Sequence, residues 1–315
     1  MVRDTSESQR KAKILVEALP FIRRYRSKVV VIKVGGEMLE NLALSESLTQ
    51  DLILLKSVGI QVVLCHGGGP QISESMRQLG KKSVFIEGLR VTDAETMDIT
   101  AMVMLGRINA RLTALINSQG AQAVGISGID AKLFEVERED PRLGFVGRIH
   151  KVNTALVMGL LQAGCLPVVS PLGIDAAGEI YNINADLAAG ELAAALAAEK
   201  LIILTNVSGL YEVFGLDETL ISETRADKLR EMLESGAAAA GMIPKLQAIL
   251  RALTAGVPRA HILDGRDQHA LLLEIFTPQG IGTLITSGAE DEAVSYTHLR
   301  AHETPEHLVC RLLLE

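Results

Sequence analysis

The chain alternates short apolar runs of strand length with longer segments of helical periodicity. The runs lie at residues 29–33, 62–65, 166–170, 201–204 and 260–263, and they are rich in β-branched residues. Several are apolar at successive positions, as in central strands that helices cover on both faces. Gly80, Gly120 and Gly164 each follow an apolar stripe of helical spacing, where a helix would end. This order predicts an α/β fold with a mainly parallel sheet, whose ligands bind at the carboxyl ends of the strands.

Composition excludes several classes of protein. Four Tyr, six Phe and no Trp leave too few rings for single-stranded nucleic acid to stack on. The net charge of -7 provides no basic face for duplex DNA. Three widely spaced Cys form no disulfide framework, and neither a signal peptide nor a membrane-spanning run is visible. We therefore expect a cytoplasmic protein with no nucleic-acid or membrane partner.

Two terminal segments lie outside this alternation. Apolar residues at helical spacing in 10–26, interrupted by Pro20, predict a helix that needs its own domain or another subunit to bury against. Residues 294–315 show no clear periodicity, and their three His and Cys310 fit no zinc module. We interpret 291–315 as a non-native or disordered tail and exclude it from the fold.

Two glycine-rich loops follow the first two predicted strands. The first is residues 33–36, which begin with Lys33, and the second is 66–69, a His followed by three Gly and then Pro70. Such loops let backbone N–H groups approach an anion, although a tight strand–helix turn explains either loop alone. Neither matches the phosphate-binding P-loop of nucleoside triphosphatases or the dinucleotide-binding fingerprint. His66 is a candidate base, but it can equally hold its loop by hydrogen bonds.

Charged and amide residues stand near other expected strand ends and helix starts. Arg90 offers a planar fork for a carboxylate, and Asn182, Asn184 and Asp186 precede an Ala-rich helix that one of them can cap. Lys245 falls at the second residue of an expected helix, where a cation is unfavourable unless an anion lies nearby. Two lysines with one aspartate indicate charge neutralisation and positioning, as phosphoryl transfer requires. A carboxylate acceptor is already ionised at neutral pH and needs no general base.

A series of motifs occurs in order between residues 10 and 288. They are KVGGE (33–37), HGGGPQI (66–72), GLRVTD (88–93), LPVVSPLG (166–173), YNINAD (181–186), ILTNVSGLY (203–211), GMIPK (241–245), HILDGR (261–266) and LLLEIFTPQGIGT (271–283). Together they resemble the acetylglutamate kinases of the amino acid kinase family. The resemblance implies an αβα sandwich around an eight-stranded, mainly parallel sheet. It also implies an oligomerisation helix (1–27), an N-terminal lobe that binds the acyl amino acid and dimerises (28–198), and an ATP-binding C-terminal lobe (199–290).

The implied reaction transfers the γ-phosphoryl group of ATP to the side-chain carboxylate of N-acetyl-L-glutamate, the second step of arginine synthesis. By match of motif, Lys33 and Lys245 would stabilise the transferring group, and Asp186 would orient both lysines. Gly68, Gly69, Arg90 and Asn182 would bind the acyl amino acid. Gly35, Gly36, Thr205, Asn206, Ser208, Gly209, Leu210, Gly241 and Met242 would contact ATP, and Mg²⁺ would arrive with the nucleotide, without protein metal ligands.

Two positions depart from the family pattern. Glu37 stands where a small or neutral residue is usual, and it would weaken nucleotide binding only if it points inward. Ala240 replaces a glycine before Gly241 and would stiffen the loop that carries Lys245. Two other functions stay open: a kinase for another acylated acidic amino acid, and an arginine-sensing pseudokinase.

The helix at 10–26 resembles that of arginine-sensitive members, in which it joins three dimers into a hexamer. L-Arginine would then be a feedback inhibitor bound between this helix and the C-terminal lobe, near Phe21, Glu274 and Gly280. Phe21 lies where a Tyr is common, which would weaken arginine binding. The sequence leaves open whether this chain forms a hexamer or a dimer.

Overall fold

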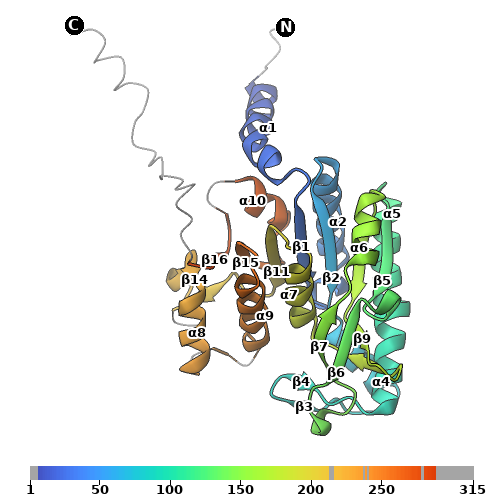
Figure 1. Cartoon of the computed structure of the whole chain (residues 1–315). Helices are drawn as coiled ribbons and strands as arrows, with labels where there is room; N and C mark the ends of the chain where they lie inside the picture. Colours follow the sequence, from blue (N-terminus) through green and yellow to red (C-terminus); the bar gives the residue numbers. More distant parts are fainter. Residues whose placement is uncertain (1–5, 213–215, 237, 240, 278–279, 289–315) are drawn as a thin grey trace, which may run out of the picture.

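The computed structural model describes residues 6–212, 216–236, 238–239, 241–277 and 280–288 (Figure 1). The predicted tail at 291–315 and the substitution at Ala240 therefore lie outside the described residues.

An eight-stranded sheet runs through the molecule and confirms the predicted fold class. The strand order is β14 (Glu223–Arg225), β16 (Thr283–Thr286), β15 (Arg259–Asp264), β11 (Lys200–Thr205), β1 (Val29–Val34), β2 (Gln61–His66), β8 (Leu166–Ser170) and β5 (Ala123–Ser127). The β15–β16 pair is antiparallel, and every other neighbouring pair is parallel. The carboxyl ends of β1, β2, β11 and β8 consequently meet at one edge.

Helices cover both faces of this sheet, as Figure 1 shows. One face packs on α6 (Ala155–Gln162), α7 (Ala185–Ala195), α8 (Ala226–Glu234) and α9 (Ile243–Thr254). The opposite face packs on α2 (Leu42–Ser57), α5 (Ala110–Ser118) and α10 (Ala270–Phe276). Neighbouring strand residues alternate between the two cores: Val31 joins the first, and Val30 and Ile32 join the second. Burial on both sides explains why the strands read as unbroken apolar runs.

Shorter elements surround the edge where the strands end. They are a four-stranded sheet of β10 (Ile180–Asn182), β9 (Leu172–Ile174), β6 (Phe134–Arg138) and β7 (Gly147–Val152), the hairpins β3 (Phe85–Ile86) with β4 (Leu89–Arg90) and β12 (Leu210–Tyr211) with β13 (Leu220–Ile221), and the short turns η1 (Met38–Glu40), η3 (Asp130–Lys132), η4 (Pro141–Leu143) and η5 (Asp217–Thr219). The apolar patterns did not predict these strands, because β6 and β7 mix polar with apolar residues and the others have only two or three residues.

The apolar stripe that precedes Gly120 lies on one continuous helical segment with an irregular centre. It comprises α4 (Ala94–Ala101), the π-helix η2 (Met102–Asn109) and α5. By length and composition this segment is apolar enough to cross a membrane. It instead packs as a core helix, because Met97, Met104, Ile108 and others are buried against α3 (Gly69–Gln78) and Leu172.

The predicted N-terminal helix is α1 (Ser6–Tyr25), which continues through Pro20. It stands out from the sheet beside α10 (Figure 1). Only its end joins the core, where Phe21 packs partly and Tyr25 is 4% exposed. Its apolar residues Ile14, Leu15 and Val16 are more than half exposed.

Candidate active site

Lys33, Asp186 and Lys245 form a buried cluster, although they are far apart in the sequence. The Nζ of Lys33 lies 2.8 Å from Oδ1 of Asp186, and the Nζ of Lys245 lies 3.1 Å from Oδ2. The side chains of Lys33 and Asp186 are almost inaccessible, whereas that of Lys245 is 15% exposed. One carboxylate thus holds two ammonium groups, which leaves a net positive charge facing the loops at the strand ends.

Charge balance keeps Asp186 ionised. Burial by itself would raise the pKa of this carboxyl, but the charges and hydrogen bonds of Lys33 and Lys245 outweigh burial and lower it below 3.8. At neutral pH the aspartate is therefore a fixed anion that orients two cations. It does not serve as a proton donor.

Three elements place this cluster. Lys33 is on β1 and points to the face covered by α7 and α9, since it alternates with Ile32. Asp186 is in the first turn of α7, which Asn184 caps by accepting hydrogen bonds from the N–H groups of Asp186 and Leu187. Helices α7 and α9 approach closely at Gly190, where a Cβ would lie 2.6 Å from the carbonyl oxygen of Ala248. Capping therefore explains Asn184, and ion pairing explains Asp186.

Lys245 is the third residue of α9, not the second, because the helix begins at Ile243 before Pro244. Its position near a helix N-terminus remains unfavourable for a cation. The carboxylate of Asp186 is the anion that compensates for it, together with the carbonyl of Gly241, 3.3 Å from Nζ.

The two glycine loops lie against each other beside this cluster. A Cβ on Gly36 would lie 3.1 Å from Cα of Gly68, and a Cβ on Gly67 would lie 3.8 Å from Cβ of Ala185, the neighbour of Asp186. Gln71, which the sequence reasoning missed, donates from Nε2 to the carbonyl of Gly36 at 2.6 Å. Gly69 has open space where its side chain would be, so its backbone is accessible. The loops form a continuous backbone surface next to the paired lysines.

His66 is buried beneath its loop, where its ring nitrogens have hydrogen-bond partners. The ring is fully buried, and burial lowers its pKa to about 4, so it is neutral at physiological pH. Its Nδ1 lies 3.1 Å from the carbonyl of Gly67, and its Nε2 faces Asn109 and Ser170. Of the two readings of His66, this geometry favours the one in which it holds the loop by hydrogen bonds.

Arg90 is a buried cation whose neighbours are neutral. Its guanidinium donates to the carbonyl of Gly69 at 2.9 Å and to Ser73 and Ser83, and it lies 4.7 Å from the ring centre of Phe85. Burial lowers the pKa of this group, but a guanidinium remains charged at neutral pH. Among the described residues no carboxylate pairs with it. A buried guanidinium without a carboxylate partner is suited to an anionic ligand.

Asn182 lies next to the segment of Arg90. Its Nδ2 is 3.5 Å from Oγ1 of Thr92, which in turn donates to the carbonyl of Arg90. Asn182 and Arg90, two of the four residues predicted to hold the acyl amino acid, therefore come together through Thr92, which the motif reasoning did not single out.

The residues predicted to contact ATP follow the ends of β1 and β11. Thr205 ends β11, and Asn206, Ser208 and Gly209 form the loop that leads to Leu210. The N–H of Leu210 donates to Oγ1 of Thr283 at 2.8 Å, so β16 holds this loop. Gly35, Gly241 and Met242 lie in the neighbouring loops, where Gly241 precedes α9 with open space around it.

Glu37 lies beside this loop. Its exposed carboxylate accepts a hydrogen bond from Nδ2 of Asn206 at 3.0 Å. The side chain therefore bridges the first glycine loop and the loop after β11, and it adds a negative charge next to the predicted nucleotide contacts.

Glu274 and Gly280 lie together near the end of α1. Oε1 of Glu274 lies 2.6 Å from Nδ1 of His261, and Oε2 accepts from the N–H of Ile281 at 3.1 Å. Burial would raise the pKa of Glu274, but His261, Lys200 and that N–H outweigh burial and lower it. Phe21 packs in the same core as α10. The sequence reasoning missed His261 as a partner of Glu274.

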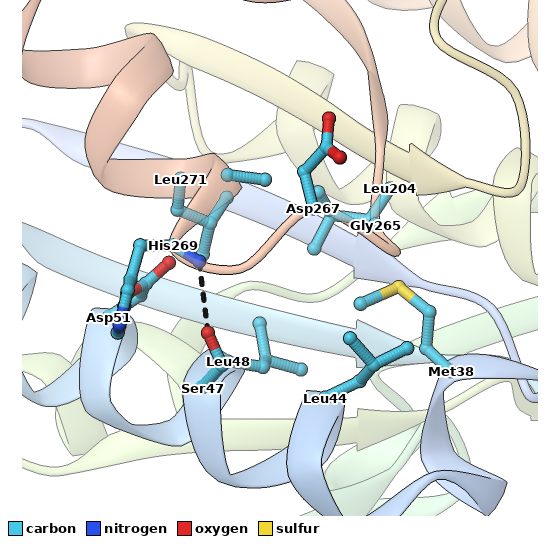
Figure 2. Close-up of a pocket in the computed structure, with 11 residues that line it drawn as sticks. Met38, Leu44, Ser47, Leu48, Asp51, Leu204, Gly265, Asp267, His269 and Leu271 are labelled. Carbon is cyan, nitrogen blue, oxygen red and sulfur yellow. Dashed lines mark hydrogen bonds and ion pairs between the residues drawn. The ribbon is translucent and has the colours of Figure 1, made fainter.

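A small pocket between α2 and the turn before α10 lies apart from the lysines (Figure 2). In it the N–H of His269 donates to Oγ of Ser47 at 2.9 Å, and Nδ1 of His269 lies 2.7 Å from the buried Asp51. Met38 fills one side, where a Cβ on Gly265 would overlap it. These contacts join α2 to the turn before α10.

No group of three or more His, Cys, Asp or Glu side chains able to hold a metal occurs in the described part of the chain. The donor set therefore does not fit a metal ion bound by the protein alone, and we derive no step through one.

Comparison with known proteins agrees with this geometry. The fold and the lysine-lined site define a phosphotransferase, and residues 28–264 match the model of the amino acid kinase family. The chain belongs to the amino acid kinase family. Acetylglutamate kinases are among its curated relatives. That of Alkaliphilus metalliredigens is 44% identical over 90% of both chains, and that of Nitrosococcus oceani is 46% identical over 87% of this chain and 95% of its own.

Solved structures share the fold. N-acetylglutamate synthase from Neisseria gonorrhoeae, complexed with coenzyme A and N-acetyl-glutamate, has a TM-score of 0.79 and 29% identity over 89% of this chain. This chain spans 64% of that synthase. Giardia carbamate kinase, at 18% identity over 82% of this chain and 99% of its own, has a TM-score of 0.62 and shares the fold alone.

Proposed function

We propose that this protein is an acetylglutamate kinase, which transfers the γ-phosphoryl group of ATP to the side-chain carboxylate of N-acetyl-L-glutamate. One observation carries the proposal: Asp186 is buried between Lys33 and Lys245, next to two glycine loops. The relatives named acetylglutamate kinase, similar over most of the chain, support this substrate.

The chemistry needs charge neutralisation and no base. A carboxylate acceptor with a pKa of about 4.3 is ionised at neutral pH and attacks as it stands. The obstacle is repulsion between this anion and the anionic phosphoryl group. Lys33 and Lys245 offset that repulsion, and their effect is largest in the transition state, where negative charge spreads over the transferring oxygens. The fixed anion Asp186 keeps both ammonium groups in place.

Arg90 and the second glycine loop would hold the acceptor. The guanidinium has only neutral partners among the described residues, so the α-carboxylate of the acyl amino acid would complete its charge. Asn182 would bind the acetamide, and the N–H groups of Gly68 and Gly69 would bind acidic oxygens. This assignment orients the side-chain carboxylate toward the lysines.

The nucleotide would bind in the half of the sheet that begins at β11. Its phosphates would contact Gly35, Gly36, Gly241 and Met242. The rest of the nucleotide would lie against residues 205–210. Mg²⁺ would come with ATP, bound mainly by phosphates and water. We assign residues 28–198 to the acyl amino acid and to dimerisation, 199–290 to ATP, and the reaction to the cytoplasm.

We further propose that L-arginine inhibits the enzyme and that α1 mediates a hexamer. Exposed apolar residues on α1, including Leu15 and Val16, would pair with another copy of the helix. Glu274 and Gly280 would contact the effector near Phe21. N-acetylglutamate synthase from Neisseria gonorrhoeae, 26% identical over 87% of this chain and with a TM-score of 0.75, was solved with L-arginine.

A coupled assay of ADP release tests the proposal. We expect ADP release that depends on N-acetyl-L-glutamate and disappears in Asp186→Asn. Faster release with an acylated aminoadipate would indicate a kinase for a longer acceptor. Arginine binding without ADP release from any acylated acidic amino acid would indicate a pseudokinase.

A further inference from the structure

Beneath the second glycine loop lies a buried polar network with no part in charge neutralisation. Neutral His66 ends β2, and its two ring nitrogens face in different directions. Nδ1 lies 3.1 Å from the carbonyl of Gly67, and Nε2 lies 3.1 Å from Nδ2 of Asn109 and 2.8 Å from Oγ of Ser170. In a neutral ring, Nδ1–H then donates to Gly67, and Nε2 accepts from the amide and the hydroxyl.

Asn109 and Ser170 are themselves fixed by backbone groups. Nδ2 of Asn109 also donates to the carbonyls of Val168 on β8, at 2.9 Å, and Ile126 on β5, at 3.3 Å. Ser170 is the last residue of β8, and its hydroxyl lies 3.3 Å from the carbonyl of Met104. The ring of His66 is thus held between the rigid ends of three strands and the helix at 102–109.

The π-helix explains how one helix reaches both the ring and the loop. Buried residues recur in pairs five positions apart, at 103–104 and 108–109, with 105–107 exposed between them. In an α-helix, residues five apart point in clearly different directions, whereas a π-helix pairs i with i+5. The wider turn places Met104, Ile108 and Asn109 on one face.

That face also packs directly on the glycine loop. A Cβ on Gly68 would overlap Ile108 and Met104, so the helix packs tightly against the loop at this residue. Gly67 is held from the other side, because its N–H donates to the carbonyl of Val34 at 2.8 Å. The loop is thus packed between the helix on one side and the end of β1 on the other, close to Ala185 beside the lysine cluster.

We propose that Asn109 and Ser170 are positioning residues, which act through His66 to fix the phosphate- and carboxylate-binding loop at residues 67–69. This inference rests on the proposed function for its kinetic test. It adds residues that touch neither substrate. It also explains the π-helix as the element that places Asn109 next to His66.

Matched substitutions separate this role from simple packing. Ser170→Ala removes the hydroxyl that faces Nε2. Ser127→Ala is the control, because Ser127 pairs with Ser170 in the sheet register, is equally buried, and bonds to Asp130 outside the network. His66→Asn keeps an N–H at the position of Nδ1 and removes the acceptor at Nε2, while His66→Gln does the reverse.

A double-mutant cycle in kcat is the first test. We expect Ser170→Ala to lower kcat roughly three- to tenfold, as loss of one buried hydrogen bond does, with little change in KM. In the His66→Asn background, which lacks the Nε2 acceptor, Ser170→Ala should cause no further loss. His66→Gln, which lacks the donor to Gly67, should lose more activity than His66→Asn. Equal losses from Ser170→Ala in both backgrounds, or from Ser127→Ala, would overturn the proposal.

Hydrogen exchange gives a test that does not depend on the reaction. Amides of the peptide at residues 66–72 should exchange several-fold faster in Ser170→Ala than in Ser127→Ala, while peptides of α9 stay unchanged. Unchanged exchange at 66–72 would refute the positioning role, even if the protein acts on another substrate. Faster exchange together with no ADP release from N-acetyl-L-glutamate would keep the positioning role and refute the proposed function.

Discussion

The charged residues of the site differ in whether they have an oppositely charged partner among the described residues. Asp186 has two cationic partners, so Lys33 and Lys245 are oriented before any substrate arrives. Arg90 has no anionic partner among the described residues, so its charge is left for a ligand. The first arrangement is preorganised for catalysis and the second for binding, and substitutions should separate the two.

Lys245→Ala should lower kcat by about a hundredfold with a small change in KM, because its ammonium acts chiefly on the transferring phosphoryl group. Steady-state kinetics with varied ATP checks this. Arg251→Ala is the control on the same helix, since its exposed side chain pairs with Glu191, away from the Asp186 cluster. A kcat close to that of the parent enzyme would remove Lys245 from the mechanism.

Arg90→Ala should raise KM for N-acetyl-L-glutamate at least tenfold and leave KM for ATP unchanged, because the planar fork would bind the α-carboxylate. Arg90→Lys should not restore KM, since an ammonium cannot reach Ser73, Ser83 and Gly69 at once. Kinetics with each substrate varied in turn measures both constants. A selective loss of ATP binding would place Arg90 at the other end of the site.

The buried histidines should make the protein less stable in mild acid. The pKa values of His66 and His261 fall from 6.5 to about 4 on folding, chiefly through burial. Between these values the unfolded chain binds protons that the folded chain does not, so stability is lost as pH falls. Thermal unfolding from pH 7 to about pH 5 should show a falling Tm. His66→Asn should show a smaller fall, and an identical fall in both proteins would contradict the assignment.

Residues with a chemical motif were predictable, and their supporting partners were not. Lys33, Asp186 and Lys245 come together as the motifs implied, because strand ends and helix starts converge at one edge of a parallel sheet. Gln71, Asn109 and Ser170 show no pattern in the sequence. Their roles depend on which backbone carbonyl lies opposite, and only the packed structure determines that.

At the scale of elements, the first turn of α7 positions Asp186, the carboxylate that holds both lysines. Asn184→Ala should cost about 1 kcal/mol of stability, because two N–H groups lose their acceptor. It should also lower kcat, since Asp186 sits on the turn that frays. Denaturant unfolding and ADP release measure the two effects. Asn184→Asp retains the cap and should restore stability, whereas equal stability of Asn184→Ala and the parent would show that the cap contributes nothing.

Apolar periodicity predicted the long elements and missed the short and irregular ones. Strands β1, β2, β8, β11 and β15 and helix α1 lie where the sequence placed them. The π-turn was not predictable, because the stripe of Met104, Ile108 and Leu112 fits an ordinary helix equally well. Its extra residue becomes visible only in burial, where both Ile108 and Asn109 face inward.

At the scale of the molecule, α1 offers a surface that the described chain leaves uncovered. Deleting residues 1–19 should give an active dimer that arginine does not inhibit, since Ile14, Leu15 and Leu19 are lost and Tyr25 is kept. A longer deletion would remove Tyr25 from the core, where Lys200 lies 5.1 Å from its ring centre. Light scattering and rates in millimolar arginine test this. An intact protein that is dimeric and insensitive to arginine would refute the proposed regulation.

The shared sheet also sets a length scale for the acceptor. Strands β1 and β2 are hydrogen-bonded neighbours, with Lys33 opposite Cys65 and Val34 opposite His66, so Lys33 and the second glycine loop, which would hold the acceptor, extend from one ladder. No flexible linker separates them, and the ladder resists stretching. An acceptor with one more methylene must therefore bend to place its carboxylate correctly, because the protein cannot lengthen to receive it. Selectivity for the length of the acceptor's side chain would then come from the stiffness of the paired strands.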